Sequence, residues 1–154
     1  MAKVGILMGS ESDREVVEQA IPYLEYFGIT SDIRVMSAHR TPKDVQEFSS
    51  NAESNGFDII IACAGMAAHL PGVVAAFTSL PVIGVPLAAG HLNGMDSLLS
   101  ILQMPAGVPV ATMAVGKAGI RNAAIFSAQI ISRFDEKVKA QFKKFKENQC
   151  KIPQ

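Results

Sequence analysis

The segment SAHRTP, from Ser37 to Pro42, carries the residues of this chain best suited to acid–base chemistry. It directly follows the apolar-rich run DIRVM. A histidine side chain titrates near neutrality, so His39 can give or take a proton at working pH. Arg40 beside it offers a planar guanidinium that suits a phosphate group. The alternative is that His39 is only a hydrogen-bonded histidine at the end of a strand.

A second candidate segment, MGSESD from Met8 to Asp13, places glycine and small hydroxyl residues where a strand gives way to a helix. Backbone N–H groups at a helix start favour a phosphate, and Ser10 and Ser12 add hydroxyl donors. The Asp13 carboxylate would repel a phosphate, so we expect it to accept hydrogen bonds from ribose hydroxyls. The alternative is that Ser12 or Asp13 merely caps the helix.

A third segment, AGMAAHLPG from Ala64 to Gly72, is built of small residues around His69. Small side chains let a flat ligand approach the backbone, although the same composition also suits plain tight packing. The fourth segment, PLAAGHLNGMDS, contains His91. This histidine is either part of the site or a solvent-exposed side chain without a role in it. The three histidines do not predict a metal site, because none has a partner at helical i, i+4 spacing or a neighbouring ligand carboxylate.

Five short apolar runs predict the strands that position these segments. They are Lys3 to Met8, Ser31 to Met36, Phe57 to Cys63, Pro81 to Val85 and Val108 to Val115. Three of them are almost entirely apolar, which is typical of a parallel sheet covered on both faces.

Segments of helical period lie between the strands. They run from about Asp13 to Phe27, Pro42 to Asn55, His69 to Ser79 and Met95 to Met104, and Gly28 and Gly56 end the first two. Alternating strands and helices predict an α/β fold with a doubly wound parallel sheet. Ligands of such sheets bind beyond the carboxyl ends of the strands, so the candidate segments share one rim.

The composition predicts one compact domain: 154 residues, 49% of them hydrophobic. A formal net charge of zero gives no indication of nucleic acid or an anionic membrane as partner. Cys63 and Cys150 are too few for a disulfide framework or a thiolate metal site. The sequence shows no charged, cleavable leader and no apolar run long enough to span a membrane, so we expect a cytoplasmic protein.

The C-terminal region differs from the rest of the chain. The segment from Ala118 to Ser132 is apolar nearly all round, as expected of a helix buried on more than one side. We expect the catalytic domain to span residues 1–132 and a helical tail to span 133–154. The tail is rich in lysine, as a solvated helix is, but it also carries an apolar stripe that needs a partner surface: Phe134, Val138, Phe142 and Phe145. We expect this stripe to pack on a neighbouring subunit, and packing on the same chain is the alternative.

Taken in order, several segments resemble the N5-carboxyaminoimidazole ribonucleotide mutase family of de novo purine synthesis, in its bacterial-type form. They are ILMGSESD, SAHRTP, AGMAAHLPG, GVPL and the long stretch from NGMDSLLS to GIRNAA, and together they cover roughly Val4 to Ser132. The resemblance implies a flavodoxin-like three-layer α/β/α sandwich with a five-stranded parallel sheet. It also implies a homo-octamer, no cofactor and no metal.

The resemblance further implies a mutase that moves the carboxylate of 5-carboxyamino-1-(5-phospho-ribosyl)imidazole from the exocyclic nitrogen to the ring carbon. His39 is the implied proton carrier. The implied substrate-binding residues are Ser10, Ser12, Asp13, Ser37, Ala38, Arg40, Gly65, Ala67, His69 and Leu70. Functional coupling to the ATP-dependent synthetase that makes this substrate is a further expectation.

Four residues depart from the family pattern: Cys63, Met66, His91 and Arg121. If the Met66 position needs a positive φ, a non-glycine residue there costs about 1–3 kcal/mol. Two other functions remain open. One is the related carboxylase that takes free carbon dioxide, whose fourth loop is richer in proline. The other is a non-catalytic nucleotide or flavin binding module, although only two tyrosines and no tryptophan are available to stack a flavin.

Overall fold

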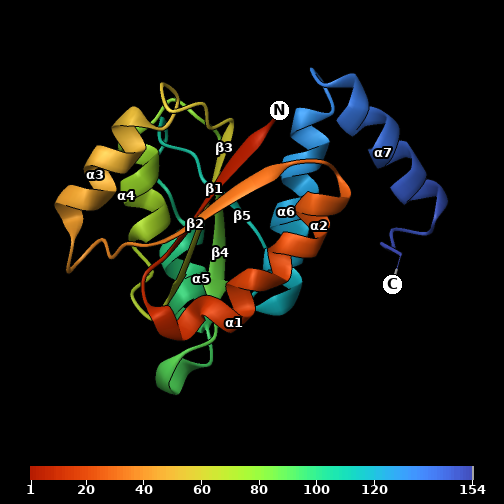
Figure 1. Ribbon diagram of the computed structural model, residues 1–154. Helices are drawn as coiled ribbons and strands as arrows, with labels where there is room; N and C mark the ends of the chain where they lie inside the picture. The colour runs from red at the N-terminus through yellow and green to blue at the C-terminus, as the bar shows by residue number, and fades with distance from the viewer. Residues whose placement is uncertain (154) are drawn as a thin grey trace.

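A single parallel sheet of five strands forms the centre of the molecule (Figure 1), in a computed structural model that describes residues 1–153. The strands are β1 (Lys3–Met8), β2 (Thr30–Val35), β3 (Ile59–Gly65), β4 (Val82–Leu87) and β5 (Ala111–Thr112). Their order is β2-β1-β3-β4-β5, and every neighbouring pair is parallel. The α/β class and the five-stranded parallel sheet expected from the sequence are confirmed.

Helices alternate with the strands, as the sequence predicts. They are α1 (Arg14–Val17), α2 (Ile21–Tyr26), α3 (Pro42–Asn51), α4 (Leu70–Phe77), α5 (Met95–Leu102), α6 (Lys117–Ile131) and α7 (Glu136–Glu147). The first predicted helix is interrupted, because the short 3-10 turns η1 (Glu11–Asp13) and η2 (Glu18–Ala20) lie beside α1 and α2; a third, η3 (Gly90–Leu92), follows β4. Gly28 and Gly56, the predicted helix ends, have φ of 72° and 77°, which glycine adopts without strain.

The fifth strand is much shorter than the predicted run from Val108 to Val115. Only Ala111 and Thr112 pair, with Ile83 and Gly84 of β4. Pro109 has no N–H to donate to a ladder, and β5 is an edge strand with a partner on one side only. The strand predicted from the apolar composition of this run is therefore longer than the strand in the structure.

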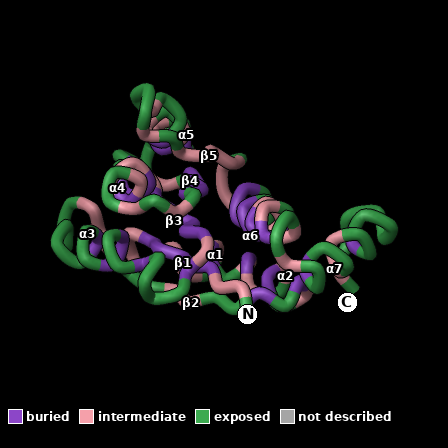
Figure 2. Tube along the Cα trace, turned by 90° about the horizontal axis from the view of Figure 1, so that it is seen from above, coloured by how far each residue is buried: buried purple, intermediate pink, exposed green. Residues whose placement is uncertain are grey.

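The helices form two layers, one on each face of the sheet, so the predicted three-layer sandwich is confirmed. Seen from above in Figure 2, α3, α4 and α5 lie on one side of the sheet and α2 and α6 on the other, with α7 outside them. The two layers bury separate hydrophobic clusters against the two faces. Strands covered on both faces explain why β3 and β4 are almost continuously apolar.

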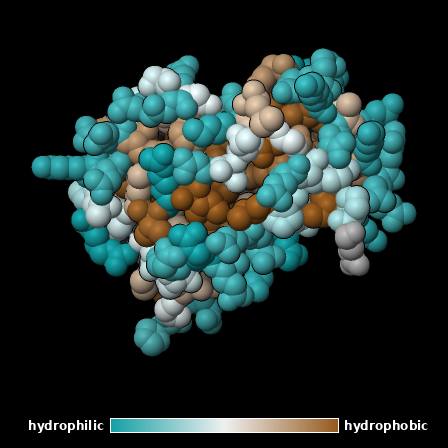
Figure 3. Space-filling model, viewed as in Figure 1, coloured by the Kyte–Doolittle hydropathy of each residue, from teal (hydrophilic) through white to brown (hydrophobic). Residues whose placement is uncertain are grey.

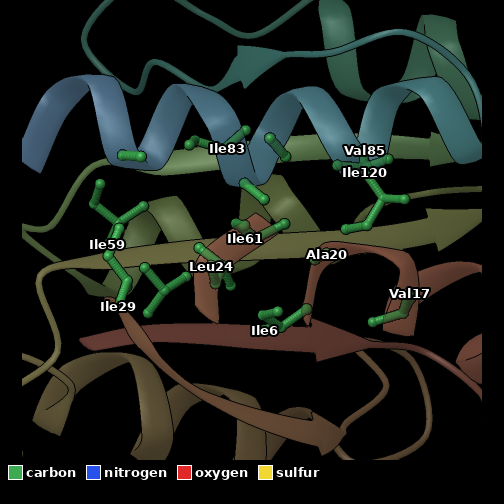
Figure 4. Close-up of a cluster of buried hydrophobic side chains, with 14 of the residues drawn as sticks. Ile6, Val17, Ala20, Leu24, Ile29, Ile59, Ile61, Ile83, Val85 and Ile120 are labelled. Atoms are coloured by element: carbon green, nitrogen blue, oxygen red, sulfur yellow. The ribbon is translucent and has the colours of Figure 1, made fainter. Parts of the chain in front are cut away.

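A row of isoleucines crosses the sheet on the face that α6 covers. Ile6 pairs with Ile61, and Ile61 pairs with Ile83, so three neighbouring strands present the same side chain at the same level. Figure 4 shows this row beneath α6, with Leu24 and Ile120 contributed by the helical layer. All five side chains are fully buried, which fixes the register of the strands and the height at which each strand ends.

The C-terminal helix packs on the same chain. Phe145 and Phe142 of α7 contact the ring of Phe27 at centroid distances of 5.3 and 5.7 Å, and Tyr26 lies 6.2 Å from Phe145. Phe134 precedes the helix and remains 65% exposed. The apolar stripe is thus largely covered within the chain, and contact of the tail with a neighbouring subunit stays a prediction.

The surface of the molecule is not uniformly polar. Figure 3 shows apolar side chains gathered across the middle of one face, between the two helical layers. A second group of exposed large apolar residues lies on α4, α5 and the turn before α5: Phe77, Leu92, Met95, Leu99 and Leu102. Within residues 1–153, no helix is long and apolar enough to cross a membrane.

Candidate functional site

The strand order reverses at β1, whose neighbours are β2 on one side and β3 on the other. The chain leaves the carboxyl ends of these three strands in three loops, and a crevice forms between loops that diverge in this way. A cavity of about 350 Å³ lies there. It is lined by Gly9, Ser10, Ser12, Asp13, Ser37, Ala38, His39, Arg40, Ala64, Gly65, Met66, Ala67, Leu70 and Ala89.

The cavity brings together nearly all the residues singled out in the sequence. Ten of them line it: Ser10, Ser12, Asp13, Ser37, Ala38, His39, Arg40, Gly65, Ala67 and Leu70. His69 does not line the cavity, but its ring contacts the ring of His39, which does. Sequence reasoning did not select Gly9, Ala64, Met66 and Ala89 as site residues. Each belongs to a rim segment already identified, so loop membership was the available signal.

The loop after β1 is organised by Ser10. Its hydroxyl accepts hydrogen bonds from the backbone N–H of Ser12 (3.3 Å) and from the Ser12 hydroxyl (2.9 Å). Ser10 therefore caps the turn η1, a role that the sequence had assigned to Ser12 or Asp13 as an alternative. With both bonds accepted, the Ser10 O–H is left to donate into the cavity.

Asp13 ends the turn η1 in the same loop and is only partly accessible to water. Partial burial raises the pKa of the Asp13 carboxyl above its usual value, while the Ser10 backbone, the Ser12 side chain and the charge of Arg40 act in the opposite direction. A carboxylate that has lost part of its hydration is a good acceptor for ligand hydroxyls, because such hydroxyls restore the lost hydrogen bonds.

Arg40 links the loops after β1 and β2. Its Nη2 donates to the carbonyl oxygen of Gly9 at 2.6 Å, and its Nε donates to the Ser37 hydroxyl at 3.4 Å. Thr41 closes the loop by accepting the Ser37 backbone N–H through its hydroxyl. Pro42 then begins α3, as its fixed φ predicts. The guanidinium is thereby held beside the Ser10 loop while still exposed to a ligand.

His39 and His69 come from different loops and meet at the edge of the cavity, which His39 lines. Nε2 of His39 lies 2.8 Å from Nδ1 of His69, and the two rings are nearly perpendicular, at 81°. A hydrogen bond at this distance requires a proton on one of the two facing nitrogens and a lone pair on the other. The pair can therefore hold one proton between its facing atoms and pass it to a group in the cavity.

The loop after β3 approaches the loop after β4 very closely. A Cβ atom on Gly65 would lie 2.9 Å from Cβ of Ala89, so only glycine fits there. The next residue, Met66, has a φ of 52°. A positive φ at a non-glycine residue costs about 1–3 kcal/mol, so this departure from the family pattern strains the backbone. The residues of this wall are therefore mostly small and apolar, and its backbone is strained at Met66.

The three other departures from the family pattern lie outside the cavity wall. His91 is exposed in η3, and Arg121 is exposed on α6, where it donates to Oε1 of Gln19 at 2.8 Å. Cys63 is fully buried in β3, and burial raises the pKa of its thiol. Within the described residues, no cluster of three His, Cys, Asp or Glu side chains has the arrangement of a metal site.

Comparison with known proteins relates nearly the whole chain to one family. The model of the AIR carboxylase family matches residues 3–151. The chain is 51% identical over 147 residues to N5-carboxyaminoimidazole ribonucleotide mutase of Vibrio parahaemolyticus, covering 96% of this chain and 91% of the relative. It is 52% identical over 145 residues to the protein of the same name in Bacillus subtilis, with coverage of 94% and 90%.

Solved structures give the same relation in three dimensions. The crystal structure of Treponema denticola PurE superposes on this chain with a TM-score of 0.85 and 32% sequence identity. The superposition covers 97% of this chain and 92% of that one. The similarity therefore extends over the whole sheet, both helical layers and the loops that form the cavity.

Proposed function

The chain belongs to the AIR carboxylase family, and from this premise we propose that it is an N5-carboxyaminoimidazole ribonucleotide mutase of purine biosynthesis. Its substrate is 5-carboxyamino-1-(5-phospho-ribosyl)imidazole, and its product is 5-amino-1-(5-phospho-ribosyl)imidazole-4-carboxylate. The enzyme is an intramolecular transferase. The observation that carries the proposal is the contact between His39 and His69 in a cavity that also holds Arg40.

One end of the cavity suits a ribose phosphate. Arg40 supplies a fixed positive charge, and Ser10 and Ser12 supply hydroxyl groups within the adjoining loop. Asp13, which follows in the same loop, accepts from the ribose hydroxyls. A cation, hydroxyl donors and a carboxylate thus line the same cavity, and these are the groups that a phosphate and a ribose need.

The other end of the cavity suits the imidazole ring and its carboxylate. Gly65, Ala67 and Leu70 line the cavity from the loop after β3, and Ser37 and Ala38 line it from the loop after β2. Small residues let the flat ring approach the main chain closely, where N–H groups are available to a carboxylate. His69 lies behind His39 and borders this end.

The reaction needs one group that both gives and takes a proton. The bond between the exocyclic nitrogen and the carboxyl carbon breaks, its electron pair stays on nitrogen, and nitrogen takes a proton from His39. The ring carbon then forms a bond to the released carbon dioxide and returns its own proton to His39. Holding both fragments in one cavity makes recapture effectively unimolecular, which is where much of the acceleration arises.

We further propose that the enzyme acts in the cytoplasm as a homo-octamer. The exposed apolar residues of α5 support association, because a surface of this kind is covered when a second copy packs on it. The partner that supplies the substrate is the ATP-dependent synthetase of the carbamate. Coupling to that synthetase shortens the time that a labile carbamate spends in solution.

One assay tests the proposed reaction directly. The purified protein is incubated with the carbamate substrate, and formation of the ring-carboxylated product is followed in buffer without added bicarbonate. A mutase gives a steady rate under these conditions. A carboxylase that takes free carbon dioxide gives a rate from aminoimidazole ribonucleotide that rises with bicarbonate, and a binding module gives no product from either compound.

A further inference from the structure

The hydroxyl of Thr41 makes an unusual contact for a residue at the start of a helix. Thr41 precedes Pro42, the first residue of α3, and a threonine in that position ordinarily accepts a hydrogen bond from a backbone N–H of the first helical turn. The Thr41 side chain makes no such bond. The N–H groups of Asp44 and Val45 donate instead to the Thr41 carbonyl oxygen, at 3.1 and 3.3 Å. The hydroxyl is therefore available for another contact.

That contact is with Ser37, at the other end of the loop after β2. The Thr41 hydroxyl oxygen accepts the backbone N–H of Ser37 at 3.0 Å and lies 3.4 Å from the Ser37 carbonyl oxygen. The Thr41 N–H donates to the same carbonyl oxygen at 2.9 Å. Thr41 thus binds both backbone polar groups of Ser37 and closes a turn of five residues. The three residues inside this turn, Ala38, His39 and Arg40, all line the cavity.

Ser37 in turn holds the side chain of Arg40. The Ser37 hydroxyl accepts the backbone N–H of Arg40 at 3.2 Å and its Nε at 3.4 Å, while Nη2 of Arg40 donates to the Gly9 carbonyl oxygen at 2.6 Å. A chain of hydrogen bonds therefore runs from Thr41 through Ser37 and Arg40 to the loop after β1. An arginine side chain has many rotamers, so fixing its guanidinium before the ligand arrives lowers the entropic cost of binding a phosphate.

We propose that Thr41 is a positioning residue for ribonucleotide binding, which acts through Ser37 to hold the Arg40 guanidinium in place for the phosphate. This role rests on the proposed function, because the phosphate of the ribonucleotide is what Arg40 binds. Thr41 does not line the cavity, so it acts on the ligand only through its neighbours. His39 has a separate contact with His69, and the Thr41 hydroxyl therefore affects affinity more than turnover.

Two substitutions separate the hydroxyl from the rest of the Thr41 side chain. Thr41→Val keeps the branched shape without the hydroxyl, and Thr41→Ser is the matched control that keeps the hydroxyl. Thr41→Val is expected to raise the dissociation constant of aminoimidazole ribonucleotide about 3- to 10-fold, the usual effect of one lost hydrogen bond, whereas Thr41→Ser stays within about twofold of wild type. Turnover at saturating substrate changes by less than about threefold in both. Calorimetry and steady-state kinetics measure these effects.

An Arg40→Ala background shows whether the effect passes through the guanidinium. In that background Thr41→Val is expected to change the dissociation constant by less than about twofold, because the group that Thr41 positions has been removed. An equal loss of affinity in both backgrounds overturns the positioning role, as does an unchanged affinity of Thr41→Val alone. The hydroxyl makes no cap bond to α3, so Thr41→Val should melt close to wild type, which separates lost affinity from unfolding.

A measurement on the free protein keeps this role separate from the proposed function. The Ser37 N–H is bonded to the Thr41 hydroxyl, so its hydrogen exchange should be faster in Thr41→Val than in wild type and Thr41→Ser. Equal exchange rates of this N–H in all three proteins overturn the positioning role, whatever the ligand. Failure of wild type to bind the ribonucleotide would instead reject the proposed function itself.

Discussion

His39 Nε2 and His69 Nδ1 lie 2.8 Å apart, although the two residues are 30 positions apart in the chain. His39 follows β2, and His69 precedes α4 after β3. Because β1 separates these strands in the sheet, the contact spans the point where strand order reverses. Two imidazoles at this distance share one proton between their facing nitrogens, so each constrains the proton position of the other.

His39→Asn is expected to separate chemistry from binding. Asparagine keeps a hydrogen-bonding side chain but cannot exchange a proton near neutral pH, so turnover at saturating substrate falls about 10²–10⁴-fold. The dissociation constant of the ribonucleotide stays within a few-fold of wild type. Steady-state kinetics and calorimetry measure the two effects. Near-normal turnover would transfer the role of proton carrier to another group, with His69 the next candidate.

His39 and His69 are expected to act as one unit. If His69 orients His39 through their shared proton, His69→Asn slows turnover on its own but adds little once His39 has been replaced. The double variant then turns over about as slowly as His39→Asn alone. Rates of the four proteins at saturating substrate form the required cycle. Fully multiplicative losses would show that the two rings work independently.

Arg40→Ala is expected to weaken ribonucleotide binding. A charge-assisted contact to phosphate contributes about 1.5–3 kcal/mol, which corresponds to a rise in the dissociation constant of roughly 10- to 150-fold. Lys43→Ala is a matched control, because Lys43 is an exposed cation three positions further along the chain that does not line the cavity. Equal affinities of the two variants would remove Arg40 from the phosphate site.

Asp13→Asn is expected to stabilise the free protein while weakening substrate binding. The pKa of Asp13 is raised in the folded chain above its ordinary value of 3.8, so the unfolded chain loses this proton first as pH rises. Wild-type stability therefore falls as pH rises from below 3.8 through the folded pKa, and the full cost is present at neutral pH. Asparagine lacks this cost.

Thermal melts of both proteins across this pH range check the sign. The melting temperature of Asp13→Asn should exceed that of wild type at pH 7 by more than it does below pH 3.8, where both side chains are neutral. The opposite trend would mean that the Asp13 carboxylate stabilises the fold, and that hydrogen bonds from Ser10 and Ser12 outweigh its desolvation.

The chain is expected to assemble into a large homo-oligomer. Leu99 and Leu102 are each about half exposed on α5, and a second copy would cover them. Light scattering of wild type at micromolar concentration should give a mass several times that of one chain, and the double substitution of both leucines to lysine should lower it. A wild-type mass equal to one chain would contradict the assembly.

The sequence alone determined the class of fold and the rim on which the site lies. Apolar runs such as that around Ile61 must be buried on both faces, and that requirement leads to a parallel sheet with helices on each side. Candidate residues that follow such strands must then share the carboxyl edge. Pro42 marked the start of α3, because its fixed φ is local information.

Only the tertiary structure decided how close particular side chains come. The distance between His39 and His69 depends on the order of β2, β1 and β3, which hydrophobic periodicity does not encode. The shortness of β5 depends on its edge position, and the packing of α7 depends on the shape of the surface around Phe27. The positive φ of Met66 is likewise set by the loops that meet around it, because local sequence alone would place methionine at a negative φ.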